Sequence, residues 1–87
     1  MSLMLYVYVL LSLQDGGLYI GFTKDLKSRL KRHKLGMVES TKSRLPLKLV
    51  YYEACLSEAD ALRREKYLKT TYGRRYLKSR LKGYFTG

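Results

Sequence analysis

The chain has 87 residues, the size of one small domain, and 46% of them are hydrophobic, enough for a folded core. Lys and Arg number 18 against 7 Asp and Glu, so the formal net charge is +11. This charge favours a polyanionic partner, nucleic acid before a ribosomal or membrane surface. We expect residues 1–87 to form a single unit. Cys55 is the only cysteine, so an internal disulfide is excluded, and the composition is compatible with a reducing cytoplasm. Cys55 itself is predicted to be a small buried hydrophobic residue.

The first apolar segment, residues 3–13, predicts a buried β-strand, because it is almost continuously apolar or aromatic and contains β-branched Val7 and Val9. It is too short to span a membrane and lacks the charged start of a signal peptide. The Asp-Gly-Gly sequence at 15–17 predicts a tight turn, and residues 18–22 predict a returning strand. Together these segments predict a β-hairpin.

A helix is predicted over about residues 26–35, with Thr23 or Asp25 as its N-cap and Gly36 at its end. Residues 37–46 show no clear hydrophobic period and are predicted to form a loop.

The second half of the chain begins with a predicted strand over residues 47–54. Ser57 then caps a helix predicted over about 58–71, which Gly73 breaks, and a short helix follows over about 75–82. The order ββαβαα predicts an α+β domain in which helices cover a small sheet.

Glu65 is the most informative single residue, because it lies on an otherwise apolar stripe of its predicted helix. The other members of this stripe are Ala61, Leu68 and Tyr72. A carboxylate there costs free energy unless it is paired, hydrogen-bonded or coordinated to a cation. An ion pair or hydrogen bond with Arg29, His33 or Lys69 and a hard oxygen ligand for Mg²⁺ are both compatible with the pattern.

Arg29 and His33 are four positions apart and therefore share one face of the first helix. Arg29 suits a bidentate contact with phosphate, whereas His33 suits either a proton shuttle or a favourable position at the negative end of the helix. Tyr8 and Tyr19 fall on the paired strands of the hairpin, where tyrosines usually serve packing. Beside a metal-binding glutamate, such a phenol can instead order or deprotonate water.

Basic residues concentrate on the first helix and in the C-terminal third of the chain. They suit contacts with the phosphate backbone rather than base reading. The candidates for nucleic-acid binding are Lys24, Lys27, Arg32, Lys69, Arg74 and Arg75.

In this order, these residues resemble the GIY-YIG nuclease family. The first motif appears as Tyr6-Val7-Tyr8, and the second as Tyr19-Ile20-Gly21 across a glycine turn. The helical and acidic positions of the family follow as Arg29, His33 and Glu65. Two positions depart from the pattern: the glycine that opens the first motif is Tyr6, and a lysine that some repair members carry after the second motif is Phe22.

The resemblance implies a three-stranded antiparallel sheet flanked by helices, and hydrolysis of DNA phosphodiester bonds with one divalent ion, Mg²⁺ or Mn²⁺, held by Glu65. It also implies that Tyr8 helps to generate the nucleophile, that Tyr19 and Arg29 position the phosphate, and that His33 assists. Small stand-alone members similar to the N-terminal nuclease domain of the ABC excinuclease look most like this chain, which points to DNA repair or recombination.

Three classes of function remain compatible with these features. The first is a nuclease without a second DNA-reading domain, which is expected to select the structure of its DNA substrate (single-stranded, branched or damaged). Its affinity is expected to fall with salt, and its specificity to come from a partner protein or from DNA shape. A non-catalytic DNA- or RNA-binding module explains the charge equally well. A ribosome-associated basic protein leaves Glu65 unexplained, and the complete set of site residues favours the enzyme.

Overall fold

The computed structural model of the protein describes residues 3–87, so Met1 and Ser2 of the apolar N-terminal segment lie outside the described residues. The predicted hairpin is confirmed, with strands β1 (Leu5–Ser12) and β2 (Leu18–Thr23). Its turn has Gly16 at a φ of 75°, a conformation that glycine adopts without steric cost.

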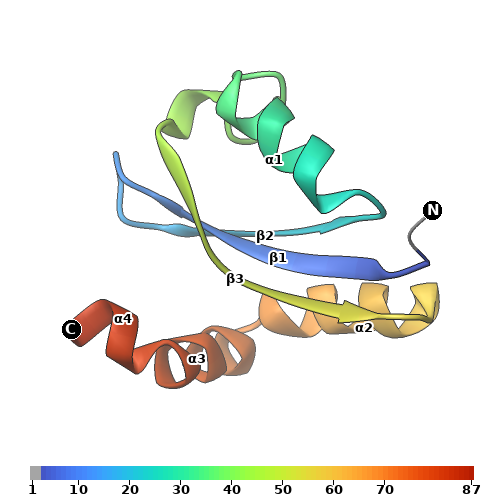
Figure 1. Ribbon diagram of the computed structural model, residues 1–87. Helices are drawn as coiled ribbons and strands as arrows, with labels where there is room; N and C mark the ends of the chain where they lie inside the picture. The colour runs from blue at the N-terminus through green and yellow to red at the C-terminus, as the bar shows by residue number, and fades with distance from the viewer. Residues whose placement is uncertain (1–2) are drawn as a thin grey trace.

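A three-stranded antiparallel sheet with the order β2-β1-β3 forms the centre of the fold, as expected, and β3 spans Leu47–Cys55. Helix α1 (Leu26–Lys34) covers one face of the sheet. Helices α2 (Glu58–Leu68) and α3 (Thr71–Arg80) lie on the other face, and the short α4 (Lys82–Thr86) follows α3 (Figure 1). The α+β class and the element order are therefore confirmed.

Short polar side chains cap the N-termini of the main helices. Asp25, rather than Thr23, caps α1 by accepting a hydrogen bond from the backbone N–H of Ser28 at 3.1 Å. Ser57 caps α2 as predicted, accepting from the backbone N–H of Asp60 at 3.2 Å. Gly36 follows α1 with a φ of 73°, and this left-handed residue ends the helix.

The helix predicted over 58–71 is wrong in its C-terminal part, because the chain forms two helices there. Helix α2 ends at Leu68, and Thr70 caps α3 by accepting a hydrogen bond from the N–H of Gly73 at 3.1 Å. Gly73 therefore lies in the first turn of α3 and does not break a helix. A Cβ at this position would overlap the carbonyl oxygen of Tyr67, so the glycine permits close contact between the two helices.

Three smaller expectations also change. Tyr72 does not share a stripe with Glu65, because it lies on α3 and is 70% exposed. The segment 37–46, predicted as a loop, contains a short 3₁₀ helix at Lys42–Arg44. Cys55 is only half-buried, although it packs against the hydrophobic core.

The hydrophobic core lies between the sheet and the α2–α3 layer. Alternate residues of β1 enter it, whereas Tyr8 and Leu10 point to the opposite face, toward α1. The buried core residues are Val7, Val9, Ile20, Ala61, Leu68 and Leu77. Within residues 3–87, none of the helices is both long enough and apolar enough to cross a membrane.

A clamp of polar groups fixes α2 to the outer strand β3. Arg64 donates to both carboxylate oxygens of Glu53 at 2.8 Å, and Tyr51 donates its hydroxyl proton to the same carboxylate at 2.7 Å. The Arg64 guanidinium, 4.7 Å from the ring centroid of Tyr76, lowers the pKa of Glu53. Because Arg64 precedes Glu65, this clamp restricts the rotation of the helix that carries Glu65.

We predict that Glu53→Gln lowers the free energy of unfolding by about 1–3 kcal/mol, because it leaves the half-buried Arg64 without its charged acceptor. Urea unfolding monitored by circular dichroism measures the loss. Glu39→Gln is the matched control, since Glu39 pairs with Lys42 on the surface, where such pairs contribute about 0–1 kcal/mol. Equal effects of the two substitutions would contradict the role of the clamp.

Candidate active site

Tyr8 occupies the centre of the site, on the middle strand of the sheet, and its side chain is fully buried. Gly21 lies directly opposite on β2. A Cβ at Gly21 would overlap the phenol ring of Tyr8, so the glycine of the second motif makes the space that the tyrosine of the first motif fills. This spatial relation explains why the two short motifs occur together.

Two side chains of α1 meet the Tyr8 hydroxyl. The Nε2 atom of His33 lies 2.7 Å from it, and the Nε–H group of Arg29 donates to it over 3.3 Å. The predicted shared face of Arg29 and His33 is therefore confirmed. Burial raises the pKa of Tyr8 above its usual value, the hydrogen bond from Arg29 opposes this, and the nearby charge of Glu65 adds to the increase.

His33 is buried, with both ring nitrogens hydrogen-bonded. Its Nδ1 atom lies 2.7 Å from the hydroxyl of Thr41. Burial, and then the positive charge of Arg29, lower the pKa of His33 to about 4, so the imidazole is neutral near pH 7. An assignment that satisfies every group has Nδ1–H donating to Thr41 and the Tyr8 hydroxyl donating to Nε2.

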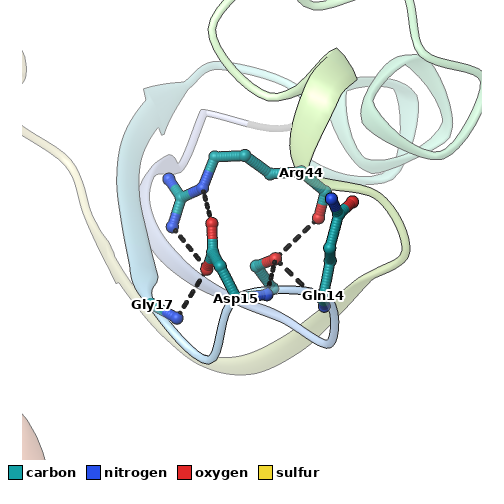
Figure 2. Close-up of polar contacts among 5 residues, drawn as sticks. Gln14, Asp15, Gly17 and Arg44 are labelled. Atoms are coloured by element: carbon teal, nitrogen blue, oxygen red, sulfur yellow. Dashed lines mark hydrogen bonds and ion pairs between the residues drawn. The ribbon is translucent and has the colours of Figure 1, made fainter.

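The hairpin turn is tied to Arg44, as Figure 2 shows, and Arg44 is three residues from Thr41 in the chain. Arg44 donates to Asp15 through Nε and a terminal nitrogen, at 2.9 and 3.3 Å, and lowers the pKa of Asp15 to about 2. The Ser12 hydroxyl donates to the Arg44 carbonyl oxygen at 2.7 Å, and the Gly17 N–H donates to Asp15 at 2.7 Å. Sequence analysis missed Thr41, because its segment has no periodic pattern.

Tyr19 lies beside Tyr8 but not directly across from it. It pairs with Leu10, one step diagonally along the hairpin, and the ring centroids of the two tyrosines are 6.3 Å apart. The centroid of the His33 ring is 5.3 Å from that of Tyr19, and the Ser40 hydroxyl donates to the Tyr19 hydroxyl over 3.4 Å. The three rings thus form one aromatic cluster beneath α1.

Glu65 lies on α2. The charge of its carboxylate is the last of the contributions that raise the pKa of Tyr8, after burial and the neighbouring Tyr19. Among the partners considered from the sequence, the structure selects Lys69, whose Nζ atom lies 3.4 Å from the Glu65 carboxylate. The Lys69 side chain is exposed, and ion pairs of this kind contribute about 0–1 kcal/mol, so the carboxylate can exchange this partner for a cation.

The donor set at Glu65 suits a magnesium-type ion rather than a protein-enclosed metal. No group of three or more His, Cys, Asp or Glu side chains converges anywhere in residues 3–87. Mg²⁺ often binds through one or two carboxylates, with water and substrate phosphate oxygens completing its shell. The single, partly exposed carboxylate of Glu65 fits that pattern.

All the basic residues predicted to bind nucleic acid are exposed, but they lie in different layers of the molecule. Lys24 is 3.7 Å from Glu58, and Arg75 lies over the ring of Tyr72. The residues at or on α1 are Lys24, Lys27 and Arg32, whereas Lys69 follows α2 and Arg74 and Arg75 belong to α3. The sheet separates α3 from α1, so the fold does not gather these residues around Tyr8 (Figure 1).

The fold that holds Tyr8 between Gly21 and α1 belongs to a known class of enzyme domain. The sequence profile of the GIY-YIG catalytic domain matches residues 4–85, and the chain belongs to the GIY-YIG family. Endonuclease activity on DNA with divalent metal ions is general in this family.

Within the family, the chain is similar to the UPF0213 proteins. It is 46% identical to one from Streptococcus agalactiae over 65 residues, which are 74% of this chain and 73% of that protein. It is 38% identical to one from Staphylococcus saprophyticus over 74 residues, 84% of this chain and 89% of that protein. The solution NMR structure of the UPF0213 protein BH0048 from Bacillus halodurans superposes with a TM-score of 0.55 at 34% identity, covering 87% of this chain and 83% of that one.

We predict that the imidazole of His33, the only histidine in the chain, titrates with a pKa of about 4 in an NMR pH series of the folded protein. The ordinary value is about 6.5, so the unfolded state binds the proton more tightly. The free energy of unfolding therefore falls as the pH drops from about 6.5 to about 4, with an upper limit of about 3 kcal/mol for this residue. A midpoint of 6 or above would contradict the buried, neutral imidazole.

Proposed function

We propose that this protein is a divalent-metal-dependent endonuclease that hydrolyses DNA phosphodiester bonds. The observation that carries the proposal is the Tyr8 hydroxyl, which bonds both His33 and Arg29 and lies within the electrostatic reach of Glu65. A buried phenol needs a hydrogen-bonding partner in any case, but a backbone carbonyl would satisfy it. His33 and Arg29 are instead two ionisable partners, and they also suit proton transfer and phosphate binding. This constellation offers a proton path, a phosphate-binding cation and a metal-binding carboxylate at one place.

Tyr8 and His33 form the proton path in this proposal. The Tyr8 hydroxyl is buried in the free protein, and in this proposal Arg29 leaves it for the substrate phosphate and so opens it to the attacking water. The Tyr8 oxygen then accepts a proton from that water while its own hydroxyl proton passes to Nε2 of His33, so Tyr8 stays neutral overall. The resulting hydroxide attacks phosphorus, and the bond to the leaving oxygen breaks. His33 donates Nδ1–H to Thr41, which holds Nε2 as the acceptor.

Arg29 couples phosphate binding to this proton path. Its charge helps to keep the pKa of His33 low in the free protein. A bound phosphate offsets that charge, so His33 becomes a better base when substrate is present. Arg29 also stabilises the charge that develops on the phosphate, and Tyr19, at the rim of the ring cluster, orients the same group.

Glu65 holds the metal ion in this scheme, and Lys69 gives up its contact with the carboxylate to a phosphate of the substrate. Glu65 would hold the divalent ion, Mg²⁺ or Mn²⁺, which would supply Lewis-acid stabilisation of the negative charge on the phosphate and the leaving oxygen. The clamp between Arg64 and Glu53 fixes α2, the helix that carries Glu65, against β3.

The exposed basic residues support substrate binding through the phosphate backbone, which carries no sequence information. We therefore propose selection of DNA structure, with affinity that falls steeply with salt. Single-stranded, branched or damaged DNA in cytoplasmic repair or recombination is the corresponding substrate class, and a partner protein can add specificity.

We expect Glu65→Gln to reduce cleavage by about 100-fold or more, the loss typical of removing one preorganised electrostatic group. Plasmid, branched and single-stranded DNA are incubated with the protein in Mg²⁺, Mn²⁺ or chelator, and products are resolved on gels. The control is Asp60→Asn, at an exposed acidic residue in the first turn of the same helix, whose partner Arg63 is not among the candidates for nucleic-acid binding. Binding without cleavage on every substrate would favour the non-catalytic module, and equal cleavage by the Glu65 variant would remove this residue from the mechanism.

Tyr8→Phe retains the ring that fills the space above Gly21 and removes only the hydroxyl. Loss of a general acid or base lowers rates by about 100- to 10,000-fold, so we expect kcat to fall by that factor with little change in DNA affinity. Single-turnover cleavage and filter binding separate the two quantities. Tyr67→Phe, at a half-exposed tyrosine of α2, serves as the control, and a Tyr8→Phe enzyme with normal kcat would exclude the proton path.

A further inference from the structure

A groove lies on the same face of the sheet as Tyr8, on the side of α1 that faces away from the Tyr8 hydroxyl. It is an open groove of about 570 Å³ between the N-terminal part of α1 and the strands β1 and β3. Tyr6 and Tyr52 form its floor, with their ring centroids 6.1 Å apart. Tyr6 occupies the position at which the family motif has glycine, so this floor exists because the chain departs from the motif.

The groove is separate from the proton path but adjacent to it. Tyr6 precedes Tyr8 by two residues on β1, about 7 Å along the strand, and Tyr52 pairs directly with Tyr8 on β3. On α1, Lys27 and Arg29 point about 160° apart, because two helical steps of about 100° each turn the chain by about 200°. Lys27 therefore faces the groove, while Arg29 faces the Tyr8 hydroxyl.

The walls of the groove combine apolar surface with positive charge. Leu26 and Leu30 form the helical wall, and Lys24 and Lys27 stand at the rim. Lys27 has no ion pair with any residue from 3 to 87, so its charge is available to a ligand. Asp25 also lines the groove, but its carboxylate accepts the capping hydrogen bond from Ser28.

We propose that this groove binds an unpaired nucleotide of the substrate, with its base stacked on Tyr52 and its phosphate at Lys27. Tyr52 is 52% exposed, so it offers a ring face to a ligand. Stacking needs the face of a base, which an intact duplex covers with its neighbouring base pairs, whereas a single strand exposes it. The inference rests on the proposed nuclease function and specifies a single-stranded segment as part of its substrate.

The test measures binding in chelator, so that it does not depend on cleavage. A fluorescein-labelled oligothymidylate, an abasic strand of the same length and a blunt duplex are titrated with the protein. We expect Tyr52→Leu to weaken oligothymidylate binding about tenfold, within the range for one stacked base, and to leave duplex binding unchanged. Tyr52→Phe keeps the ring and is expected to bind normally. Tyr72→Leu, at an exposed tyrosine on α3, is the matched control.

Several outcomes would overturn the groove assignment. The first is that Tyr52→Leu and the wild type bind oligothymidylate with equal affinity. The second is that the abasic strand binds as tightly as the strand that carries bases. The third is that the protein forms a dimer that Tyr52→Leu abolishes. A parallel cleavage assay in Mg²⁺ separates this assignment from the proposed activity. Tyr52-dependent binding without cleavage contradicts the nuclease and retains the groove, whereas cleavage without Tyr52 dependence retains the nuclease and rejects the groove.

Discussion

The site depends on a hydroxyl group buried at the centre of the sheet. Tyr8 enters the interior only because Gly21 leaves room for its ring, and its hydroxyl is stable there only with hydrogen-bonding partners. His33 and Arg29 supply those partners from α1. The need to satisfy this buried phenol therefore sets the position of α1. The same burial, together with the charge of Arg29, lowers the pKa of His33.

Support for this arrangement comes from two sides of the molecule. On one side, the ion pair of Asp15 and Arg44 ties the hairpin turn to the segment that places Thr41 against His33 (Figure 2). On the other, the pairing of Arg64 with Glu53 orients α2. Both pairs lie outside the candidate site, and both act by fixing an element that carries one of its residues.

Local signals predicted the hairpin, the first helix and the third strand, because turn glycines, caps and apolar runs act over a few residues. The division between α2 and α3 was missed, since Gly73 functions through a contact with the backbone of Tyr67 that no periodic pattern records. The bulge in the β1–β3 pairing, between Val9 and Leu10, was also invisible in the sequence. It lets Leu49 point toward α1 while Tyr51 still faces α2 and α3.

The sequence by itself determined the fold class, the shared helical face of Arg29 and His33, and the set of candidate site residues, because spacing along a strand or helix sets which side chains point together. Only the tertiary structure decided their partners: Thr41 for His33, Lys69 for Glu65, and a diagonal rather than direct pairing for Tyr8 and Tyr19. It also created the groove of Tyr6 and Tyr52, which are far apart in the chain. Such contacts arise from packing between elements, and packing depends on strand register and helix placement that local spacing does not encode.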